Sequence, residues 1–349
     1  MGSPLKDLNV LVTGAGAPGF PGITKSLRMN GERKVRIIGT DMKNDVVGFY
    51  LSDEHYVVPS GLDPTYIDAI MKIIQKENID VVLPLCTFEL LPLSKARKEI
   101  EDYGAKVAIS KPKALEIAIN KAKTYEFLRG NFIPKYKVVN TFEAFKDATY
   151  ELGYPKEPVV FKPSFGRGMR GFRIIKDDAK KKDMLFNYKP KSTFIKMTEI
   201  SEILKGGDFP ELVIMEYLPG DEYSVDTLSK DGETYYSIVR KRIETRRGIS
   251  YIGKIEKNEE LEEAPKEIIK QLRLDYNINM QFKAIENGEY KLIEINPRVS
   301  GSIVFCVRAG VNLPYFAVKL LLEEKIPKIE VKYGTKNFRY WNEVVVFST

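Results

Sequence analysis

The sequence predicts an α/β protein in which a Rossmann-like domain with a parallel sheet precedes a larger α+β unit built on antiparallel strands. Two observations support this prediction. Up to about residue 115, short runs rich in Val, Ile and Leu alternate with helical stretches, which is typical of βαβ units. Beyond that point, strand-like runs follow one another across turns that contain Gly or Pro, as antiparallel strands do.

The first 115 residues contain the elements of a parallel sheet with helices on both faces. We expect strands at 8–13, 35–40, 80–85 and 106–109, and helices at 22–30, 67–77 and 90–103. The first strand ends in a glycine-rich turn, and the second ends at Asp41. The strands are nearly continuous apolar runs, as expected where both faces of a sheet are buried.

The remaining residues predict a different architecture. We expect helices at 114–130, 264–274 and 314–324, and extended segments at 134–139, 158–163, 171–175, 212–216, 222–228, 234–243, 282–286, 290–295, 329–333 and 342–347. The segments 282–286 and 290–295 form a hairpin around Asn287-Gly288, because Asn-Gly favours the turn that joins two antiparallel strands.

The composition restricts the chemistry. With His55 as the single histidine and two cysteines, the chain lacks the donors of a typical zinc site and of a Ser-His or Cys-His hydrolase. Cys86 and Cys306 lie in apolar stretches, which predicts two buried thiols in a reducing cytoplasm. Any metal ion must then be held by oxygen ligands, which indicates Mg²⁺ or Mn²⁺.

The charge distribution argues against a macromolecular partner. The formal net charge is +7, yet the basic residues are spread along the chain without an arginine-rich tail or a nucleic-acid motif. No apolar run approaches the roughly 18–20 residues that span a bilayer. We therefore expect neither nucleic acid nor a membrane as partner. A cleft that binds polyphosphate and a carboxylate explains the excess positive charge better than nucleic-acid binding does.

A glycine-rich turn follows the first strand. Gly14-Ala-Gly16-Ala-Pro-Gly19 matches the dinucleotide fingerprint, and Asp41 could bind a ribose hydroxyl. A tight strand-to-helix turn needs glycine without any ligand as well. Pro18 and Pro21 weaken the fingerprint further, since they interrupt the start of the helix. An NAD-binding oxidoreductase or epimerase stays open as an alternative of another class.

A second glycine-rich loop follows a strand that ends near Lys162. Ser164 begins this loop, and Gly166 and Gly168 allow backbone N–H groups to approach phosphate oxygens while the lysine supplies a charge. A hairpin with a flexible tip would have the same composition. Farther along, the linker from Glu216 to Glu222 could offer backbone groups to adenine, although a solvated acidic turn would look similar.

The segment Glu294-Ile-Asn296-Pro-Arg298 is the most informative. Alternate residues of a strand face one side, so Glu294, Asn296 and Arg298 can point together. The Glu and Asn side chains supply oxygen ligands for Mg²⁺, and the arginine can neutralise phosphate. A carboxylate beside apolar strand residues is costly unless it is paired or binds a metal ion.

These segments together resemble the ATP-grasp superfamily, most closely one synthetase unit of the carbamoyl phosphate synthase large subunit. The resemblance rests on the order of Asn-Lys121-x-x-Thr, Phe-Lys162-Pro-Ser, the glycine-rich loop, Glu216–Glu222, Asn-Met-Gln281-Phe and Glu294-x-Asn296-Pro-Arg298. It implies a pre-ATP-grasp Rossmann-like domain at 1–115 and an ATP-grasp domain at 116–349. The second domain would contain a lid subdomain at about 125–212 and a C-terminal subdomain at about 213–349.

The resemblance also implies roles for individual residues. Lys121 and Lys162 would contact ATP, together with Ser164, Gly166 and Gly168 of the loop. The Glu216 carbonyl and the Leu218 amide would bind adenine, and Glu222 the ribose. Gln281, Glu294 and Asn296 would hold Mg²⁺. Arg298 would stabilise the transferring phosphoryl group, with Lys162 and Arg242 assisting, and Glu89 would lie near the acceptor.

The function that follows is an ATP-dependent ligase that joins a small-molecule carboxylate to an amine through an acyl phosphate, with a homodimer as a candidate assembly. A carbamoyl-phosphate-synthase-like enzyme that phosphorylates bicarbonate or carbamate is the alternative. Two departures weigh against carbamoyl phosphate as product. The chain has one synthetase unit rather than two, and Gly248-Ile-Ser stands where that enzyme has a histidine in the glycine turn.

Overall fold

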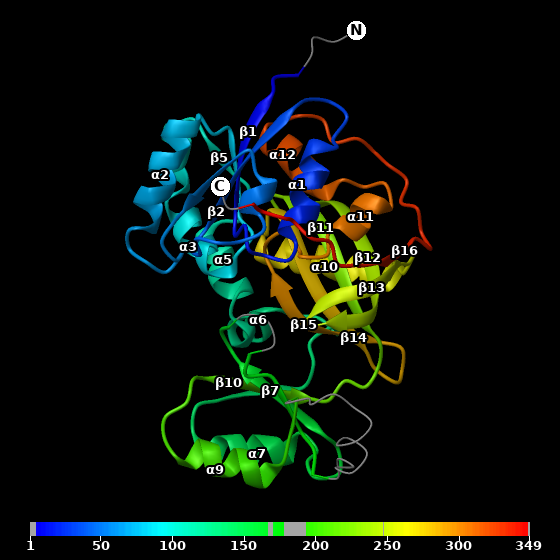
Figure 1. The fold of residues 1–349 in the computed structure, drawn as a ribbon. Coiled ribbons are helices and arrows are strands. Elements are labelled where there is room, and N and C mark those ends of the chain that lie inside the picture. Colours follow the sequence, from blue (N-terminus) through cyan, green and yellow to red (C-terminus); the bar gives the residue numbers. More distant parts are fainter. Residues whose placement is uncertain (1–4, 167–169, 178–192, 247, 348–349) are drawn as a thin grey trace. The chain divides into compact units, whose positions relative to one another are not determined.

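The computed structural model describes residues 5–166, 170–177, 193–246 and 248–347 (Figure 1). The chain forms two compact units. The large unit comprises Met1–Ala118, Glu222–Gln281 and Ile295–Thr349, and the small unit comprises Ile119–Asp221 and Phe282–Glu294. Each unit is therefore assembled from segments that lie far apart in the sequence.

The first sheet of the large unit is parallel, as predicted. Its strand order is β3-β2-β1-β4-β5, and the strands are β1 (Leu8–Thr13), β2 (Val35–Asp41), β3 (Glu54–Val57), β4 (Val81–Leu83) and β5 (Lys106–Val107). The helical elements are α1 (Phe20–Arg28), the 3-10 turn η1 (Phe49–Leu51), α2 (Tyr66–Glu77), α3 (Thr87–Lys95), α4 (Arg97–Asp102) and α5 (Pro112–Ala118). Val10, Leu11 and Val12 are fully buried, because helices cover both faces of β1.

Two details of this region differ from the prediction. α1 begins at Phe20, and Pro21 lies in its first turn, where a missing N–H costs nothing. The proline therefore starts the helix rather than interrupting it. The helix predicted at 90–103 is two helices, α3 and α4, which meet at Ala96.

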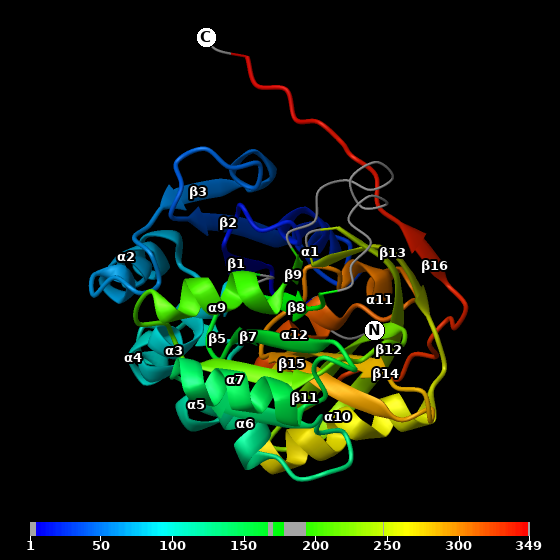
Figure 2. The ribbon, with the colours of Figure 1, turned by 90° about the horizontal axis from the view of Figure 1, so that it is seen from below.

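The second sheet lies in the large unit except for residues 282–294 of β14 and β15, and its pairs β11–β12, β12–β13 and β13–β16 are antiparallel. Its order is β15-β14-β11-β12-β13-β16. The strands are β11 (Glu222–Lys230), β12 (Glu233–Arg246), β13 (Ile249–Ile255), β14 (Tyr276–Ala284), β15 (Tyr290–Asn296) and β16 (Lys336–Phe338), and the helices are α10 (Glu259–Leu272), α11 (Val304–Arg308) and α12 (Leu313–Leu321). α10 packs against β11 and β12 (Figure 2), whereas α12 contacts β11 and α11 contacts β13.

One hydrophobic core joins the two sheets of the large unit. Phe20, Ile23 and Leu27 of α1 belong to the same buried cluster as Leu228 of β11 and Phe316 of α12. α1 also contacts both α11 and α12 directly. The parallel sheet and the six-stranded sheet are consequently parts of a single folded body.

The small unit contains a five-stranded sheet with the order β6-β10-β7-β8-β9. Its strands are β6 (Tyr136–Val139), β7 (Val159–Pro163), β8 (Arg173–Ile175), β9 (Phe194–Ile195) and β10 (Leu212–Glu216), and its helices include α6 (Lys121–Phe127), α7 (Phe142–Glu151) and α9 (Met197–Lys205). Phe145 of α7 packs edge-on against Phe161 of β7, with ring centroids 5.4 Å apart. Thr141 caps α7 by accepting a hydrogen bond from Ala144 N.

Several predicted boundaries in the second part of the sequence are wrong. The helix predicted at 114–130 is divided into α5 and α6, because Asn120 is extended and caps α6 through Lys123 N. α10 begins at Glu259, five residues early, since Asn258 caps it through Leu261 N. β14 begins at Tyr276 rather than at 282.

The predicted strands at 329–333 and 342–347 are absent from the described part of the chain, and the short strand β16 lies between them. Ile329 N donates to the Tyr236 hydroxyl, and Lys332 N donates to Ala309 O, so neither amide joins a ladder. Trp341 and Phe347 are 83% and 84% exposed. A β-rich sequence becomes a strand only where a neighbouring strand can pair with it.

Replacing Gly19 by alanine should destabilise the large unit. The added Cβ would lie 2.7 Å from Gly301 Cα, and overpacking of this kind costs about 1–3 kcal/mol. Thermal unfolding followed by circular dichroism measures the effect. Gly207→Ala is the matched control, because nothing lies within 4 Å of the Cβ that it would add. Equal melting temperatures for the two variants would contradict the close packing.

Candidate active site

Polar side chains cover part of one face of the six-stranded sheet in the large unit. The β11–β12 register pairs Ser224 with Arg240, and Asp226 lies two residues farther along β11. Asn279 of β14 donates to Asp226 Oδ1 at 2.8 Å, so it shares this face. Since side chains alternate along a strand, Glu222, Arg242 and Gln281 lie on the same face. Most of these polar side chains are buried, so each needs hydrogen-bond or ionic partners.

Arg242 and Glu222 form an ion pair on this face. Arg242 Nη1 lies 2.8 Å from Glu222 Oε1, and Nη2 donates to Gly248 O at 2.6 Å. The arginine side chain is almost fully buried, whereas the glutamate is about one quarter exposed. The residue predicted to bind ribose therefore holds the arginine predicted to assist phosphoryl transfer, and this arginine also fixes the turn after β12.

A second ion pair on the same face is completely buried. Arg240 Nη2 lies 3.0 Å from Asp226 Oδ2, and both side chains are 1% exposed. Arg240 Nη1 donates to Ser250 Oγ at 2.7 Å, and the Cys306 thiol donates to Asp226 Oδ2 at 3.6 Å. Burial raises the pKa of this thiol, and the Asp226 carboxylate raises it further. The sequence indicated neither this pair nor the polar surroundings of Cys306. Cys86, also predicted to be buried, is only half-buried.

The end of β15 carries Asn296 and continues into Arg298. Arg298 Nη2 donates to Asn296 Oδ1 at 3.3 Å, and Nη1 donates to Val299 O at 3.0 Å. Gly301, three residues later, lies against Gly19 of the turn after β1. The segment with the predicted phosphate-binding arginine is therefore held in place by its own hydrogen bonds and by packing within the large unit.

The small unit gathers a carboxylate and two lysines. Lys121 Nζ lies 4.0 Å from Glu294 Oε2, and Lys162 Nζ donates to the carbonyl of Ile293 at 2.6 Å. The buried Tyr125 hydroxyl donates to the same carbonyl at 2.8 Å. Burial raises the pKa of Tyr125, and the nearby Glu294 carboxylate raises it further. The structure thus places Lys121, Lys162 and Glu294 in one region of the small unit. Tyr125 was not predicted as a site residue, because in the sequence it has the pattern of an apolar helix residue.

The predicted phosphate loop begins beside this cluster. Lys121 N donates to Ser164 O at 2.8 Å, and Asn120 forms a β-bridge with Phe165. Ser164 is 2% exposed, and its hydroxyl has no hydrogen-bond partner in the structure. Among the described residues, no atom beyond the chain neighbours lies within 4 Å of a Cβ added at Gly166. Gly168 lies outside the described residues.

The linker predicted to bind adenine is fixed by hydrogen bonds within the small unit. Glu216 Oε1 accepts from Lys135 N at 2.8 Å, so its carboxylate anchors β6 to β10. Lys283 Nζ donates to Leu218 O at 2.6 Å. A Cβ at Gly220 would lie 2.4 Å from Ala284 O, so this linker requires glycine for close approach. The adenine contacts of Glu216 and Leu218 stay a prediction.

The oxygen donors predicted to hold magnesium lie on β14 and β15. Glu294 and Asn296, two residues apart, present one carboxylate and one amide from the same face of β15, and Gln281 offers an amide from β14. In the described part of the chain, no group of three or more His, Cys, Asp or Glu side chains could hold a metal ion without help. Mg²⁺ commonly binds through one or two carboxylates plus substrate phosphates, and this donor set has that character.

The glycine turn after β1 is explained by packing within the large unit. Gly14 has φ +63°, and a Cβ there would lie 2.4 Å from Cys86 Sγ, whereas Gly19 contacts Gly301. Asp41 accepts from Gly16 N at 2.8 Å and from Lys43 N at 2.9 Å. The Asp41 carboxylate therefore already accepts hydrogen bonds from the backbone of the turn. This weakens the alternative in which it binds the ribose of a dinucleotide.

Glu89 is part of the N-terminal fold. It is 6% exposed. Its Oε1 accepts from the backbone of Leu85 and Cys86, at 3.1 and 2.8 Å, and from the Thr13 hydroxyl, while Tyr66 donates to Oε2 at 3.0 Å. Burial raises the pKa of this carboxyl. These bonds link β1, β4, α2 and α3, so a structural role fits Glu89 better than the expected place near an acceptor.

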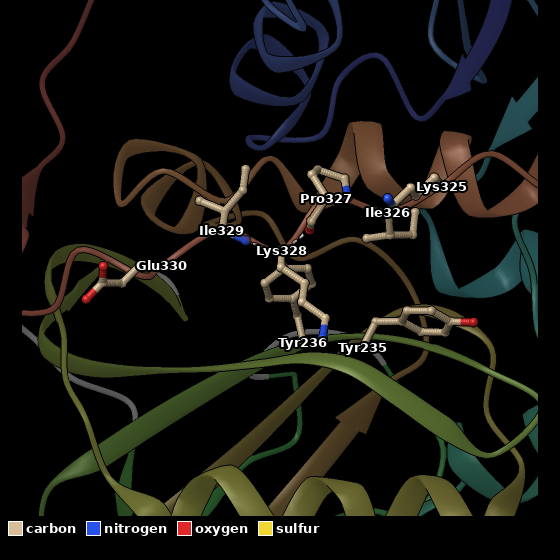
Figure 3. A pocket seen from close by; sticks show the side chains of 8 residues that line it. All are labelled: Tyr235, Tyr236, Lys325, Ile326, Pro327, Lys328, Ile329 and Glu330. Carbon is tan, nitrogen blue, oxygen red and sulfur yellow. Dashed lines mark hydrogen bonds between the residues drawn. The ribbon is translucent and has the colours of Figure 1, made fainter.

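A groove of about 760 Å³ lies elsewhere on the large unit. Tyr235, Tyr236 and residues 325–330 line it (Figure 3). The Tyr236 hydroxyl donates to Pro327 O at 2.5 Å and fixes the groove wall. None of the predicted site residues lines this groove, so its size does not identify it as the site. Within the described ranges, every helix is too short or too polar to cross a membrane.

Two family models match parts of the chain. Residues 208–343 match the family described as "ATP-grasp in the biosynthetic pathway with Ter operon", and residues 10–108 match the family described as "PylC-like, N-terminal domain". The carbamoyl phosphate synthase large chain of Thermoplasma acidophilum is 27% identical over 275 residues, which are 74% of this chain and 25% of the relative. This chain therefore spans about a quarter of the length of that relative.

Solved structures share the fold. The ADP complex of N5-carboxyaminoimidazole ribonucleotide synthetase superposes with a TM-score of 0.69 at 17% identity, covering 93% of this chain and 79% of the other. L-amino acid ligase from Bacillus licheniformis superposes with a TM-score of 0.63 at 16% identity, covering 92% and 75%. These structural similarities confirm the predicted fold class, and the two family models confirm the predicted resemblance to ATP-grasp proteins.

Replacing Arg240 by methionine should lower stability by about 3–5 kcal/mol, because Asp226 would stay buried without its cation. Arg246→Met on the same strand is the matched control, since its partner Glu244 and Arg246 are both exposed and such pairs contribute about 0–1 kcal/mol. Denaturant unfolding measures both variants. A loss for Arg240→Met no larger than that of the control would contradict the role of the buried pair.

Proposed function

We propose that this chain, which carries an ATP-grasp domain behind a PylC-like N-terminal domain, is an ATP-dependent ligase that joins a carboxylate to an amine. The observation that carries the proposal is the surroundings of Glu294. Lys121 lies 4.0 Å from its carboxylate, and the Lys162 ammonium is bonded to the neighbouring Ile293 carbonyl. One lysine beside the carboxylate and a second lysine on the adjoining backbone carbonyl suit a polyphosphate that carries a divalent cation.

Different residues would bind the phosphates, the adenine and the ribose of ATP. In the small unit, Lys121, Lys162 and the loop amides from Ser164 to Gly166 would bind phosphate oxygens, and the linker residues Glu216 and Leu218 would bind adenine through their backbone. In the large unit, Glu222 would bind the ribose, and Arg242 and Arg298 would neutralise charge on the transferring phosphoryl group. Gly168 belongs to the same loop and to the same proposed phosphate contacts.

Gln281, Glu294 and Asn296 would hold Mg²⁺ or Mn²⁺, which supplies charge neutralisation on the phosphate oxygens. The chain's own cations act beside it. Arg298 is already oriented by its bond to Asn296 Oδ1, so little reorganisation is needed when charge develops on the phosphate.

The reaction then has two steps. A carboxylate oxygen of the acid attacks the γ-phosphorus of ATP, the bond to the bridging oxygen breaks, and ADP leaves with that electron pair. The amine nitrogen attacks the resulting acyl phosphate at carbon, and phosphate leaves as the amide forms and the nitrogen loses its proton. Exclusion of water protects the acyl phosphate between the steps.

A carbamoyl-phosphate-synthase-like reaction is the second candidate. The identity of 27% with a carbamoyl phosphate synthase large chain favours it. In that case bicarbonate would replace the organic acid as phosphoryl acceptor. The segment Gly248-Ile-Ser in place of the histidine favours the ligase.

Phosphate release with ATP and Mg²⁺, measured across amino acids, small carboxylates and bicarbonate, tests the function. We expect release that depends on an organic acid and on an amine. Hydroxylamine in place of the amine should yield the hydroxamate, because it captures an acyl phosphate. Release with bicarbonate alone would select the second candidate. Tight binding of NAD(H) without any ATP turnover would refute both.

Glu294→Gln should reduce ADP formation by roughly 100-fold or more, since several kcal/mol of charge stabilisation would be lost with the metal ligand. Glu289→Gln is the matched control. Glu289 directly precedes β15, and its side chain is 46% exposed and pairs with Lys291. Thermal unfolding confirms that both variants are folded. Turnover at the wild-type rate in folded Glu294→Gln would remove the metal-site assignment.

A further inference from the structure

Arg339 carries a charge that no carboxylate in the described ranges compensates. It follows β16, and its backbone N–H donates to Tyr251 O at 2.9 Å. Its guanidinium donates through Nη2 to the carbonyl of Gly301, and Nε is buried without any hydrogen-bond partner. Arg339 is partly exposed as a whole, but its Nε is shut off from water, and a guanidinium that loses part of its hydration normally has a carboxylate or phosphate partner.

A second arginine lies beside it. The guanidinium carbon of Arg240 is 5.5 Å from the centroid of the Phe305 ring, and that of Arg339 is 5.7 Å from the same centroid. Burial lowers the pKa of Arg339, and the charge of Arg240 lowers it further. The two cations are thus held near one another against one aromatic ring.

The single buried carboxylate of this region is already shared. Asp226 accepts from Arg240 at 3.0 Å and from Asn279 at 2.8 Å, and the Cys306 thiol donates to it as well. Counting Arg240, Arg339 and Asp226, the cluster carries one positive charge in excess. The Nε of Arg240 also lacks a hydrogen-bond partner, so each arginine offers a buried donor that the protein does not use.

A neutral donor adjoins the cluster. Ser300 precedes Gly301, whose carbonyl binds Arg339, and Ser300 is 6% exposed with a hydroxyl that has no hydrogen-bond partner. The serine lies two residues after Arg298, on the segment that leaves β15. Arg240, Arg339 and Ser300 of the large unit therefore each have a donor without a hydrogen-bond partner, and the bond of Arg339 to Gly301 places this arginine next to Ser300 in the chain.

We propose that Arg339, Arg240 and Ser300 form a binding site for the carboxylate of the acid substrate. The inference rests on the proposed ligase function and specifies where the acid is recognised. A carboxylate supplies the missing negative charge, and its planar oxygens match the planar guanidinium donors. Arg298, two residues from Ser300, would then connect the acid site to the transferring phosphoryl group.

Thermal unfolding of the nucleotide-free full chain tests this site. Sodium acetate replaces sodium chloride at constant ionic strength, with sodium phosphate as a parallel series. We expect acetate to raise the melting temperature of the wild type and to have no effect on Arg339→Gln. Lys336→Gln is the matched control, since it removes one positive charge from an exposed residue of β16 and should respond like the wild type.

Three outcomes would overturn the proposal. The acetate response persists in Arg339→Gln, or it vanishes equally in Lys336→Gln, or phosphate alone acts through Arg339. Arg339→Gln also loses the hydrogen bond to the Gly301 carbonyl, so the acetate response of each variant is measured against the melting temperature of that same variant in chloride. Arg339→Lys retains the charge and should keep part of the acetate response.

Kinetics separates this site from the proposed function. With the acid found by the phosphate-release screen, Arg339→Gln should raise the KM for the acid on the order of tenfold or more, with the KM for ATP unchanged. An unchanged KM for the acid would refute the carboxylate site while leaving the ligase function intact. If no acid supports ADP formation, the ligase proposal fails and the acetate experiment still decides whether the anion site exists.

Discussion

The buried pair of Asp226 and Arg240 is the constraint on which the polar face of the large unit depends. Removing two charges from water costs more than their attraction returns unless other hydrogen bonds complete the site. Here Ser250 binds the arginine, and Asn279 and the Cys306 thiol bind the aspartate. The pair therefore fixes the register of β11, β12 and β14 relative to one another.

That register determines where the functional side chains point. Arg242 lies two residues beyond Arg240, Glu222 lies four residues before Asp226, and Gln281 lies two residues beyond Asn279. A slip of one residue would turn all three to the opposite face, where α10 packs. The positions of the candidate catalytic residues consequently depend on the buried pair. Burying this pair is costly, and the register of the strands is what it specifies.

The sequence predicted the placement of those candidate site residues that depends on local pattern. Glu294 and Asn296 share a face because they are two residues apart on a strand, and Lys162 lies on a strand before a glycine loop. The Asp226–Arg240 pair escaped prediction, because it joins residues on two strands whose register is set by the whole sheet. Arg339 escaped for a similar reason, since its neighbours Gly301 and Arg240 are distant in sequence.

The boundary errors have the same origin. Residues 342–347 have the β-branched composition of a strand, yet no neighbouring strand pairs with them in the described part of the chain, and the exposure of Phe347 reflects this. Asn120 and Asn258 were not recognised as helix caps, so two helix starts were misplaced. Propensity describes one residue, whereas pairing and capping need a partner.

The segment from Asn296 to Gly301 shows how this fold can prepare a charged site in advance. β15 fixes one end, and the contact of Gly301 with Gly19 fixes the other, so the turn that resembles a dinucleotide fingerprint acts as a packing surface. Arg298 and Ser300 lie between these anchors, and Arg339, which follows β16, donates to the Gly301 carbonyl. Because neither end can relax, the donors keep their orientation without a ligand, and binding need not supply the entropy of ordering them.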